Sequence, residues 1–311
     1  LFGGGDRGRG KGHGTSALCS CAGNDKRATA RRVFRPYRSV AICAPATPLT
    51  RDEAAAVAAL AAEEFPSIRL AFHDQCFAQA GHFAGSDAVR LAALLECAND
   101  PGTDAIWFAK GGYGCNRIVG DFIGKLGDAA MTKGYLGYSD CGTLLAALYR
   151  GGIGHPVHAP MPIDIRREGG DEAIRRVLQW MEGSDTGVEP GVGGLPAVAF
   201  NLMTLAMLVG TRFMPNLAGH EVLVEEVGEY EYAIDRLFFH VFQHLPDIAA
   251  LRLGEVTGVP VNDRPFGAEV EDIARYWCER AAVEYRGRAA IGHTAANRIV
   301  PFGLEGRRPG V

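Results

Sequence analysis

The chain has little net charge, no long apolar run and no cysteine pair with the spacing of a zinc site. Its 311 residues carry a formal charge of −4 and a pI near 6.2, so nucleic acid is not a favoured partner. No apolar run approaches the roughly 20 residues that a membrane-spanning helix needs, so we expect no membrane partner. The composition, 47% hydrophobic with a mean hydropathy of 0.00, is that of an ordinary globular protein, long enough for two domains.

The cysteines are scattered, and among them only Cys19 and Cys21 lie close together in the sequence. Several lie in apolar runs, as Cys43 does, which is typical of buried free thiols in a reducing compartment. This predicts a cytoplasmic protein. His155 and His158 are three residues apart in an extended stretch and do not share a face. We therefore expect no metal site there. We also expect no other metal and no organic cofactor.

Residues 1–38 differ from the rest of the chain, because they are rich in glycine, arginine and lysine and have almost no periodic apolar content. They lack the apolar core of a secretory signal. A transit-like segment is one interpretation. The favoured one is a disordered segment or an extension through a misplaced start.

Apolar segments alternate with helix-forming segments over residues 39–165. Four apolar runs predict strands, at residues 39–45, 68–72, 104–109 and 134–138. Between and after them the pattern predicts helices at residues 54–64, 88–98, 116–123 and 144–149. The first of these helices begins with the capping box of Thr50 and Glu53. Apolar strands that alternate with amphipathic helices indicate a parallel sheet covered on both faces.

A glycine-rich stretch follows, and a smaller α/β unit comes after it. Residues 166–195 contain a helix at 171–181 and then a glycine-rich run, which we interpret as a linker. The remainder, 196–311, predicts helices at 198–209, 230–244 and 269–281 and strands at 221–225, 248–253 and 289–291. The predicted fold class is α/β, with a parallel-sheet N-terminal domain with flanking helices (39–165) and a smaller α/β C-terminal domain.

The most informative stretch is KGYLGYSDCGTLLAALYR, at residues 133–150. An apolar run leads directly into Ser139 and a helix-forming segment follows at once. Strand, sharp turn and helix is the order of a nucleophile elbow, in which the serine hydroxyl is exposed and the next backbone N–H faces a developing oxyanion. The second glycine stands one place later than in G-x-S-x-G. A serine that merely caps a buried helix is the alternative.

A serine nucleophile needs a base and a group that orients the base, and two positions of the second domain fit. Glu225 ends the apolar run VLVE, and His293 follows the apolar run AAIG. Taken singly, Glu225 could be a solvated loop acid and His293 a structural histidine. A serine, a glutamate and a histidine that all lie at strand ends are harder to explain in that way.

Five segments resemble the LD-carboxypeptidase family, serine peptidases that include the microcin C immunity hydrolase. They occur in the family's order and extend from about residue 39 to residue 303. The segments are AIWFAKGGYGCNR (105–117), LGYSDCGTLL (136–145), Asn201-Leu202 with Val209-Gly210-Thr211, VLVEEVGE (222–229) followed by Ile234-Asp235-Arg236, and IGHTAANRIVPFG (291–303).

The resemblance implies that Ser139 is the nucleophile, His293 the general base and Glu225 the residue that orients the histidine. The backbone N–H groups of Asp140 and Gly112 would be the oxyanion donors. The absence of side chains at Gly111 and Gly112 fits this role, because backbone can then approach a substrate carbonyl. The other residues expected in the substrate-binding region are Tyr113, Arg117 and Asn201.

The sequence departs from the family at a few positions and leaves some roles open. Lys110 stands where many relatives have arginine, and Ala199-Phe200 replaces a glycine pair, which puts the pocket near Asn201 in doubt. Lys110 and Arg117 are both candidates for binding a substrate carboxylate. Competing candidates for other roles are Cys115 as a thiol nucleophile, and Glu226 or Glu229 as the orienting acid. Strand alternation places Glu225 and Glu226 on opposite faces.

By the same resemblance, the substrate is a murein tetrapeptide, cut between an L-centred diamino acid and the terminal D-alanine during cell-wall recycling. The family also leads us to expect a homodimer. A first rival function is hydrolysis of a peptide–nucleotide antibiotic for self-immunity, which predicts an aromatic residue for base stacking. A second is a non-catalytic two-domain module that closes on a small ligand.

Overall fold

Two sheets organise residues 35–303, the part of the chain that the computed structural model describes. The strand order is β10-β5-β4-β3-β1-β2 in the first sheet and β6-β7-β8-β9 in the second. All neighbouring strands pair in parallel except β10, which runs antiparallel to β5. The predicted α/β class is therefore confirmed, and the second sheet is the smaller one.

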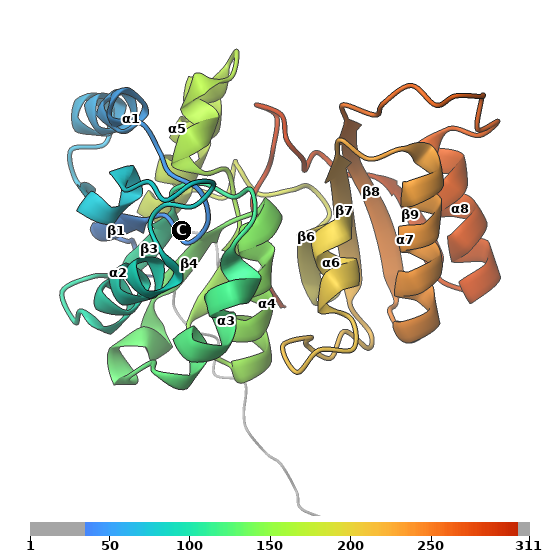
Figure 1. Ribbon diagram of the computed structural model, residues 1–311, viewed down its shortest axis with the longest axis horizontal. Helices are drawn as coiled ribbons and strands as arrows, with labels where there is room; N and C mark the ends of the chain where they lie inside the picture. Colours follow the sequence, from blue (N-terminus) through green and yellow to red (C-terminus); the bar gives the residue numbers. More distant parts are fainter. Residues whose placement is uncertain (1–34, 304–311) are drawn as a thin grey trace, which may run out of the picture. The chain divides into compact units, whose positions relative to one another are not determined.

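Helices lie on both faces of the first sheet. Its strands are β1 (Ser39–Cys43), β2 (Arg69–Phe72), β3 (Ala105–Phe108), β4 (Gly134–Gly137), β5 (His155–His158) and β10 (Val300–Pro301). The helices are α1 (Arg51–Glu64), α2 (Asp87–Asn99), α3 (Cys115–Gly124), α4 (Gly142–Gly151) and α5 (Gly170–Glu182). Helices α1 and α5 pack together, whereas α3 packs against both α2 and α4 (Figure 1). The capping box of Thr50 and Glu53 begins α1 as predicted.

The helix within the predicted linker belongs to the packing around the first sheet. Helix α5 contacts α1, and its Trp180 ring meets the ring of Tyr37 edge-on at 5.8 Å. The backbone N–H of Tyr37 donates to Met181. Of the predicted extension at residues 1–38, only residues 35–38 belong to the described range, and they lead directly into β1.

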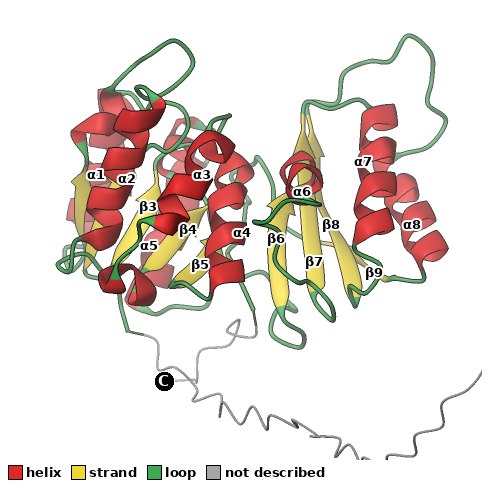
Figure 2. Ribbon diagram, turned by 60° about the horizontal axis from the view of Figure 1, so that its bottom comes forward, coloured by secondary structure: helices red, strands yellow, loops and turns green. Residues whose placement is uncertain are grey.

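The second sheet contains β6 (Ala197–Asn201), β7 (Glu221–Val227), β8 (Ala250–Thr257) and β9 (Glu284–Arg288). Its helices are α6 (Leu202–Leu208), α7 (Glu231–His244) and α8 (Val270–Ala281) (Figure 2). The helix predicted at 198–209 was wrong over its first turn, which is strand β6. A short apolar run such as AVAFN has no periodicity that separates a buried strand from a buried helix.

The strand predicted at 289–291 was also wrong, because β9 ends at Arg288. The sequence of β9, EYRGR, alternates exposed and half-buried residues and carries charges, so it lacks the apolar signature of the other strands. This composition suits an edge strand.

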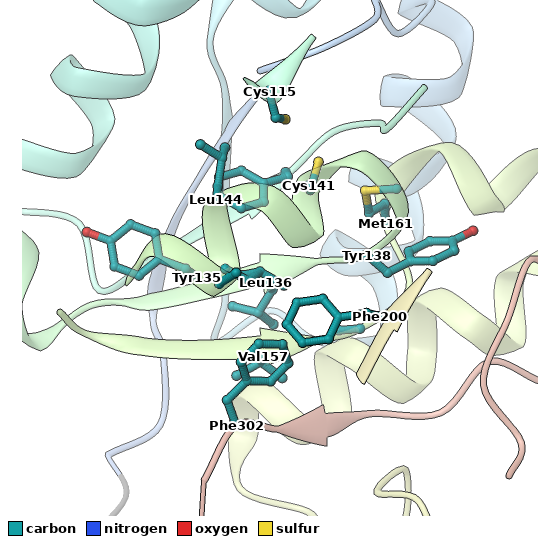
Figure 3. Packing of buried hydrophobic residues seen from close by; sticks show 14 of the residues in the cluster. Cys115, Tyr135, Leu136, Tyr138, Cys141, Leu144, Val157, Met161, Phe200 and Phe302 are labelled. Atoms are coloured by element: carbon teal, nitrogen blue, oxygen red, sulfur yellow. The ribbon is translucent and has the colours of Figure 1, made fainter. Parts of the chain in front are cut away.

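The end of the described chain returns to the first sheet, which the sequence pattern did not indicate. Strand β10 pairs with β5, with Val300 opposite His158. Just beyond it, Phe302 packs against Phe200 of β6 at a ring distance of 5.3 Å. Figure 3 shows these two rings beside Val157 of β5. The two sheets therefore share one apolar core. Within residues 35–303 there is no helix long and apolar enough to cross a membrane.

Candidate active site

Ser139 lies at a sharp turn between β4 and α4. Its backbone φ is 59°, in the left-handed region that costs a non-glycine residue about 1–2 kcal/mol. A short 3-10 turn, Ser139–Cys141, connects the strand to the helix. Neighbouring glycines make the turn possible, since a Cβ on Gly137 would lie 2.9 Å from Phe108 and one on Gly111 would lie 3.1 Å from the Cβ of Ser139. A strained serine at this position is the feature that defines a nucleophile elbow.

His293 and Glu225 lie in line with the serine hydroxyl. The Nε2 atom of His293 is 3.1 Å from Ser139 Oγ, and its Nδ1 atom is 2.8 Å from Glu225 Oε2. An ionised carboxylate only accepts hydrogen bonds, so Nδ1 carries the hydrogen and Nε2 is left free to accept from the hydroxyl. The side chain of Glu225 is 0% exposed and that of His293 is 14% exposed. The structure thus brings together the three side chains that the sequence predicted would meet.

Glu226 and Glu229 are not in this line. Glu226 is buried and accepts hydrogen bonds from the side chain of Asn201 and from the backbone N–H groups of Met203 and Val227, at 2.7–2.8 Å. Burial raises its pKa, against the effect of these donors. Glu229 lies beyond the end of β7, beside a groove between α6 and α7. Of the three acids considered, Glu225 is the one that contacts His293.

The glycine loop after β3 is fixed beside Ser139 by side chains from three separate parts of the chain. Thr47 donates its hydroxyl to the carbonyl of Gly111 at 2.6 Å. The buried guanidinium of Arg90 donates to the carbonyl of Gly114 at 3.0 Å. The carboxylate of Asp140 accepts from the N–H of Cys115 at 2.9 Å, and burial raises its pKa.

Gly112 requires its lack of a side chain for two separate reasons. Its φ is +103°, and a Cβ there would lie 2.7 Å from the methyl group of Thr47. The backbone of this loop and the N–H of Asp140 therefore flank the serine closely, with an ideal Cβ on Gly111 only 3.5 Å from Asp140 N. Sequence analysis did not find Thr47 or Arg90, because no local pattern indicates which loop they will hold.

The expected substrate-binding residues have partners within the protein or face solvent. Arg117 donates to both oxygens of Asp87 at 2.8 and 3.0 Å. Asn201 caps α6 through Thr204 and donates to Glu226. Tyr113 is 48% exposed and its ring centroid lies 6.0 Å from that of Phe83. Their roles in binding a substrate stay predictions.

Lys110 lies partly buried against the loop that follows β1. Its Nζ donates to the carbonyl of Pro48 at 3.2 Å. Burial and, to a smaller degree, the positive charge of Arg166 lower its pKa. A substrate carboxylate near these two cations would be favoured, which keeps Lys110 a candidate for that role.

Cys115, the alternative nucleophile, is fully buried, and burial raises the pKa of its thiol well above the usual value. A buried protonated thiol is a poor nucleophile. His155 and His158 occupy opposite ends of β5. Among residues 35–303 no group of three histidine, cysteine, aspartate or glutamate side chains is arranged to hold a metal ion.

A strained serine in contact with a histidine, which in turn contacts a buried carboxylate, is the arrangement that serine hydrolases use. The family models identify it further. Residues 40–159 match the LD-carboxypeptidase N-terminal domain and residues 196–307 match the LD-carboxypeptidase C-terminal domain. The chain belongs to the LD-carboxypeptidase family.

Individual relatives agree with this assignment. The murein tetrapeptide carboxypeptidase of Pseudomonas aeruginosa is 30% identical over 258 residues, 73% of this chain and 80% of the relative. The probable murein peptide carboxypeptidase of Bacillus subtilis is 26% identical over 242 residues, 73% of this chain and 75% of that protein.

Solved structures share the fold at lower identity. The muramoyltetrapeptide carboxypeptidase from Oxalobacter formigenes matches with a TM-score of 0.71 at 22% identity, over 85% of this chain and 93% of the other. MccF in complex with glutamyl sulfamoyl guanosine matches with a TM-score of 0.70 at 16% identity, over 87% and 92%. The fold is therefore shared by a carboxypeptidase and by MccF, the microcin C7 self-immunity protein.

Proposed function

We propose that this protein is a serine carboxypeptidase that cleaves the bond between an L-centred diamino acid and the terminal D-alanine of murein tetrapeptide. The observation that carries the proposal is the contact of His293 with both Ser139 Oγ, at 3.1 Å, and Glu225, at 2.8 Å. The names of the relatives supply the substrate class. We place the reaction in cell-wall peptide recycling in the cytoplasm, by a homodimer.

Ser139 would attack the carbonyl carbon of the diamino acid residue while His293 Nε2 takes the hydroxyl proton. Glu225 stabilises the imidazolium that forms. The N–H groups of Asp140 and Gly112 would donate to the oxyanion of the tetrahedral intermediate. The C–N bond then breaks, the amine of D-alanine leaves with the proton from His293, and water hydrolyses the acyl-enzyme by the same path in reverse.

The direct test is release of D-alanine from purified tetrapeptide, followed by mass spectrometry of the tripeptide product. We expect turnover by the wild-type protein and a loss of roughly 10⁴-fold or more in the Ser139→Ala variant. A peptide that ends in L-alanine is the control for stereochemistry. Robust D-alanine release by Ser139→Ala would refute the assignment of the nucleophile.

Hydrolysis of a peptide–nucleotide conjugate is the second candidate. The observation that favours it is the half-exposed ring of Tyr113, directly after Gly112 and near the rings of Phe83 and His82. An exposed ring at this position could stack on a nucleobase. A substrate panel that contains a tetrapeptide and an aminoacyl sulfamoyl nucleoside separates the two candidates, because the preferred substrate has the higher kcat/KM.

Labelling of Ser139 by a fluorophosphonate separates both enzymes from a non-catalytic binding module. We expect labelling in the wild type and none in Ser139→Ala. Slow labelling alone would not decide the question, since a site shaped for a peptide carboxylate can reject the probe.

A further inference from the structure

His158 is a fully buried histidine that the reaction does not use. It is the last residue of β5 and is 0% exposed. Strand β5 pairs with β4 so that His158 lies opposite Gly137, two residues before Ser139. His158 is therefore attached, through the sheet, to the strand that presents the nucleophile.

The partner of His158 is Asn297, which lies four residues after His293 and is also fully buried. Asn297 Oδ1 accepts from the backbone N–H of Gly292 at 3.1 Å and is 2.9 Å from His158 Nε2. Because this oxygen already accepts from a backbone N–H, His158 Nε2 must carry a hydrogen and donate it. Burial lowers the pKa of His158 to about 4, so the ring is neutral when it donates.

Through its oxygen, Asn297 connects His158 to Gly292, which belongs to the loop that carries the base. Gly292 immediately precedes His293 and has a φ of +144°, and a Cβ there would lie 2.9 Å from Glu255. From the other side, the guanidinium of Arg176 in α5 donates to the carbonyls of Ala295 and Asn297 at 3.0 and 2.7 Å. The loop is thus held by side chains from elements that surround the first sheet.

The ring of Tyr138 contacts both the buried histidine, His158, and the proposed base, His293. The Tyr138 ring lies 5.5 Å from the His158 ring and 4.9 Å from the His293 ring, centroid to centroid. Tyr138 immediately precedes Ser139, and its hydroxyl donates to Asp164 at 2.9 Å. The ring that precedes the nucleophile therefore separates the buried histidine from the base.

We propose that His158, acting through Asn297, is a positioning residue that holds His293 at hydrogen-bond distance from Ser139. The inference rests on the proposed function, because it assigns the base to His293. Its physical basis is that the base belongs to a loop after the second sheet, whereas the nucleophile belongs to the first. A misplacement of about 1 Å between reacting groups can cost about 100-fold in rate.

The test compares His158→Leu with His158→Gln. Glutamine places an amide N–H near the position of histidine Nε2, whereas leucine fills the space without a donor. We expect kcat per active site to fall by roughly 10- to 100-fold in His158→Leu, with a much smaller change in KM, and to recover most of the way in His158→Gln. His155→Leu, at the other end of the same strand, is the matched control and should keep the wild-type kcat.

The readouts separate positioning from folding. Melting temperature and active-site titration report how much protein is folded, whereas kcat per titrated site reports geometry. A wild-type kcat per site in His158→Leu would overturn the inference, as would a His158→Gln variant that is no faster than His158→Leu. Should His158→Leu fail to fold, Asn297→Leu against Asn297→Asp makes the same comparison, because aspartate keeps the acceptor.

The rate of Ser139 labelling by a fluorophosphonate keeps the two proposals distinguishable. If the wild type is labelled but releases no D-alanine, the substrate proposal fails and the labelling rates of the His158 variants still decide the positioning role. If D-alanine is released equally by the wild type and His158→Leu, the positioning role fails alone. A wild-type protein that is neither labelled nor active would overturn both.

Discussion

The two sheets fix the side chains of the proposed catalytic site in different ways. The first sheet presents Ser139 through backbone geometry, with a φ of 59° at the serine and glycines where a Cβ would collide. The second sheet contributes Glu225 directly from a strand, but His293 comes from a loop held by side-chain hydrogen bonds. Strained backbone is set by the local sequence, whereas the loop depends on residues far away in the chain.

This contrast indicates where each half of the site is vulnerable. Substitutions that alter backbone freedom should damage the nucleophile side, and substitutions that remove a single hydrogen-bond partner should damage the base side. Side-chain networks of this kind fail as a unit, because each buried donor that loses its acceptor leaves an uncompensated polar group.

The largest effect on the base side is expected for Glu225→Gln. A glutamine amide can donate to Nδ1 and so favours the tautomer that carries its hydrogen on Nε2, which can no longer accept from the serine. We expect kcat to fall by roughly 10⁴-fold, the size of effect that a wrong tautomer produces in serine proteases. Steady-state kinetics on the tetrapeptide measures it.

Glu226→Gln is the matched control for Glu225→Gln. It replaces one of the two carboxylate oxygens that accept hydrogen bonds with an NH₂ donor, so that Oε1 can still accept from Asn201 and Val227 while the acceptor for the Met203 N–H is lost. This should lower the melting temperature, with kcat per active site near that of the wild type. Equal losses of kcat in the two variants would contradict the assignment of Glu225.

On the nucleophile side the next largest effect is expected for Gly112→Ala. Alanine would have to adopt the φ of +103° that glycine has here, and its Cβ would lie 2.7 Å from the methyl group of Thr47. The loop must therefore shift, and the N–H of residue 112 moves away from the oxyanion. Loss of one oxyanion donor costs about 10²–10³-fold in kcat. Gly152→Ala, also at positive φ but with nothing within 4 Å of its Cβ, should lose stability while keeping its kcat.

The same contrast explains how far the sequence could be interpreted. The elbow was predictable because strand, serine and helix follow one another within residues 134–151. Glu225 and His293 were predictable because the first ends an apolar run and the second follows one. The return of β10 to the first sheet was not, since a two-residue strand has no pattern. The partners of Thr47, Arg90 and Asn297 were not predictable either. Each forms a hydrogen bond with a residue far away in the sequence, and only the fold identifies that residue.

A smaller effect concerns the pH dependence of stability. Burial lowers the pKa of His158 from 6.5 to about 4, so between these pH values the unfolded chain binds a proton that the folded one does not. The contribution of His158 to the free energy of unfolding is therefore fully present above pH 6.5. It decreases as the pH falls toward 4, by about 3 kcal/mol in all.

Urea unfolding of the wild type and of His158→Gln at several pH values isolates this contribution. Glu226 and Asp140 have raised pKa values and act with the opposite sign, so the difference between the two proteins is the quantity to follow. The wild type should lose more stability than the variant between pH 6.5 and 4. Parallel curves would show that His158 is not held neutral by burial.

The smallest effect on kcat is expected for Tyr113→Ala. Tyr113 lies in the glycine loop beside Ser139, and its ring is half-exposed. Removal of an exposed ring should leave kcat on the tetrapeptide within a few-fold of the wild type. With an aminoacyl nucleoside the result should differ, because stacking of a base on an aromatic ring contributes about 1–3 kcal/mol. A KM for the nucleoside that rises by about tenfold or more in Tyr113→Ala, with no such rise for the tetrapeptide, would show that this ring binds a base. Tyr113 would then determine which substrates the site accepts, and not the chemical step.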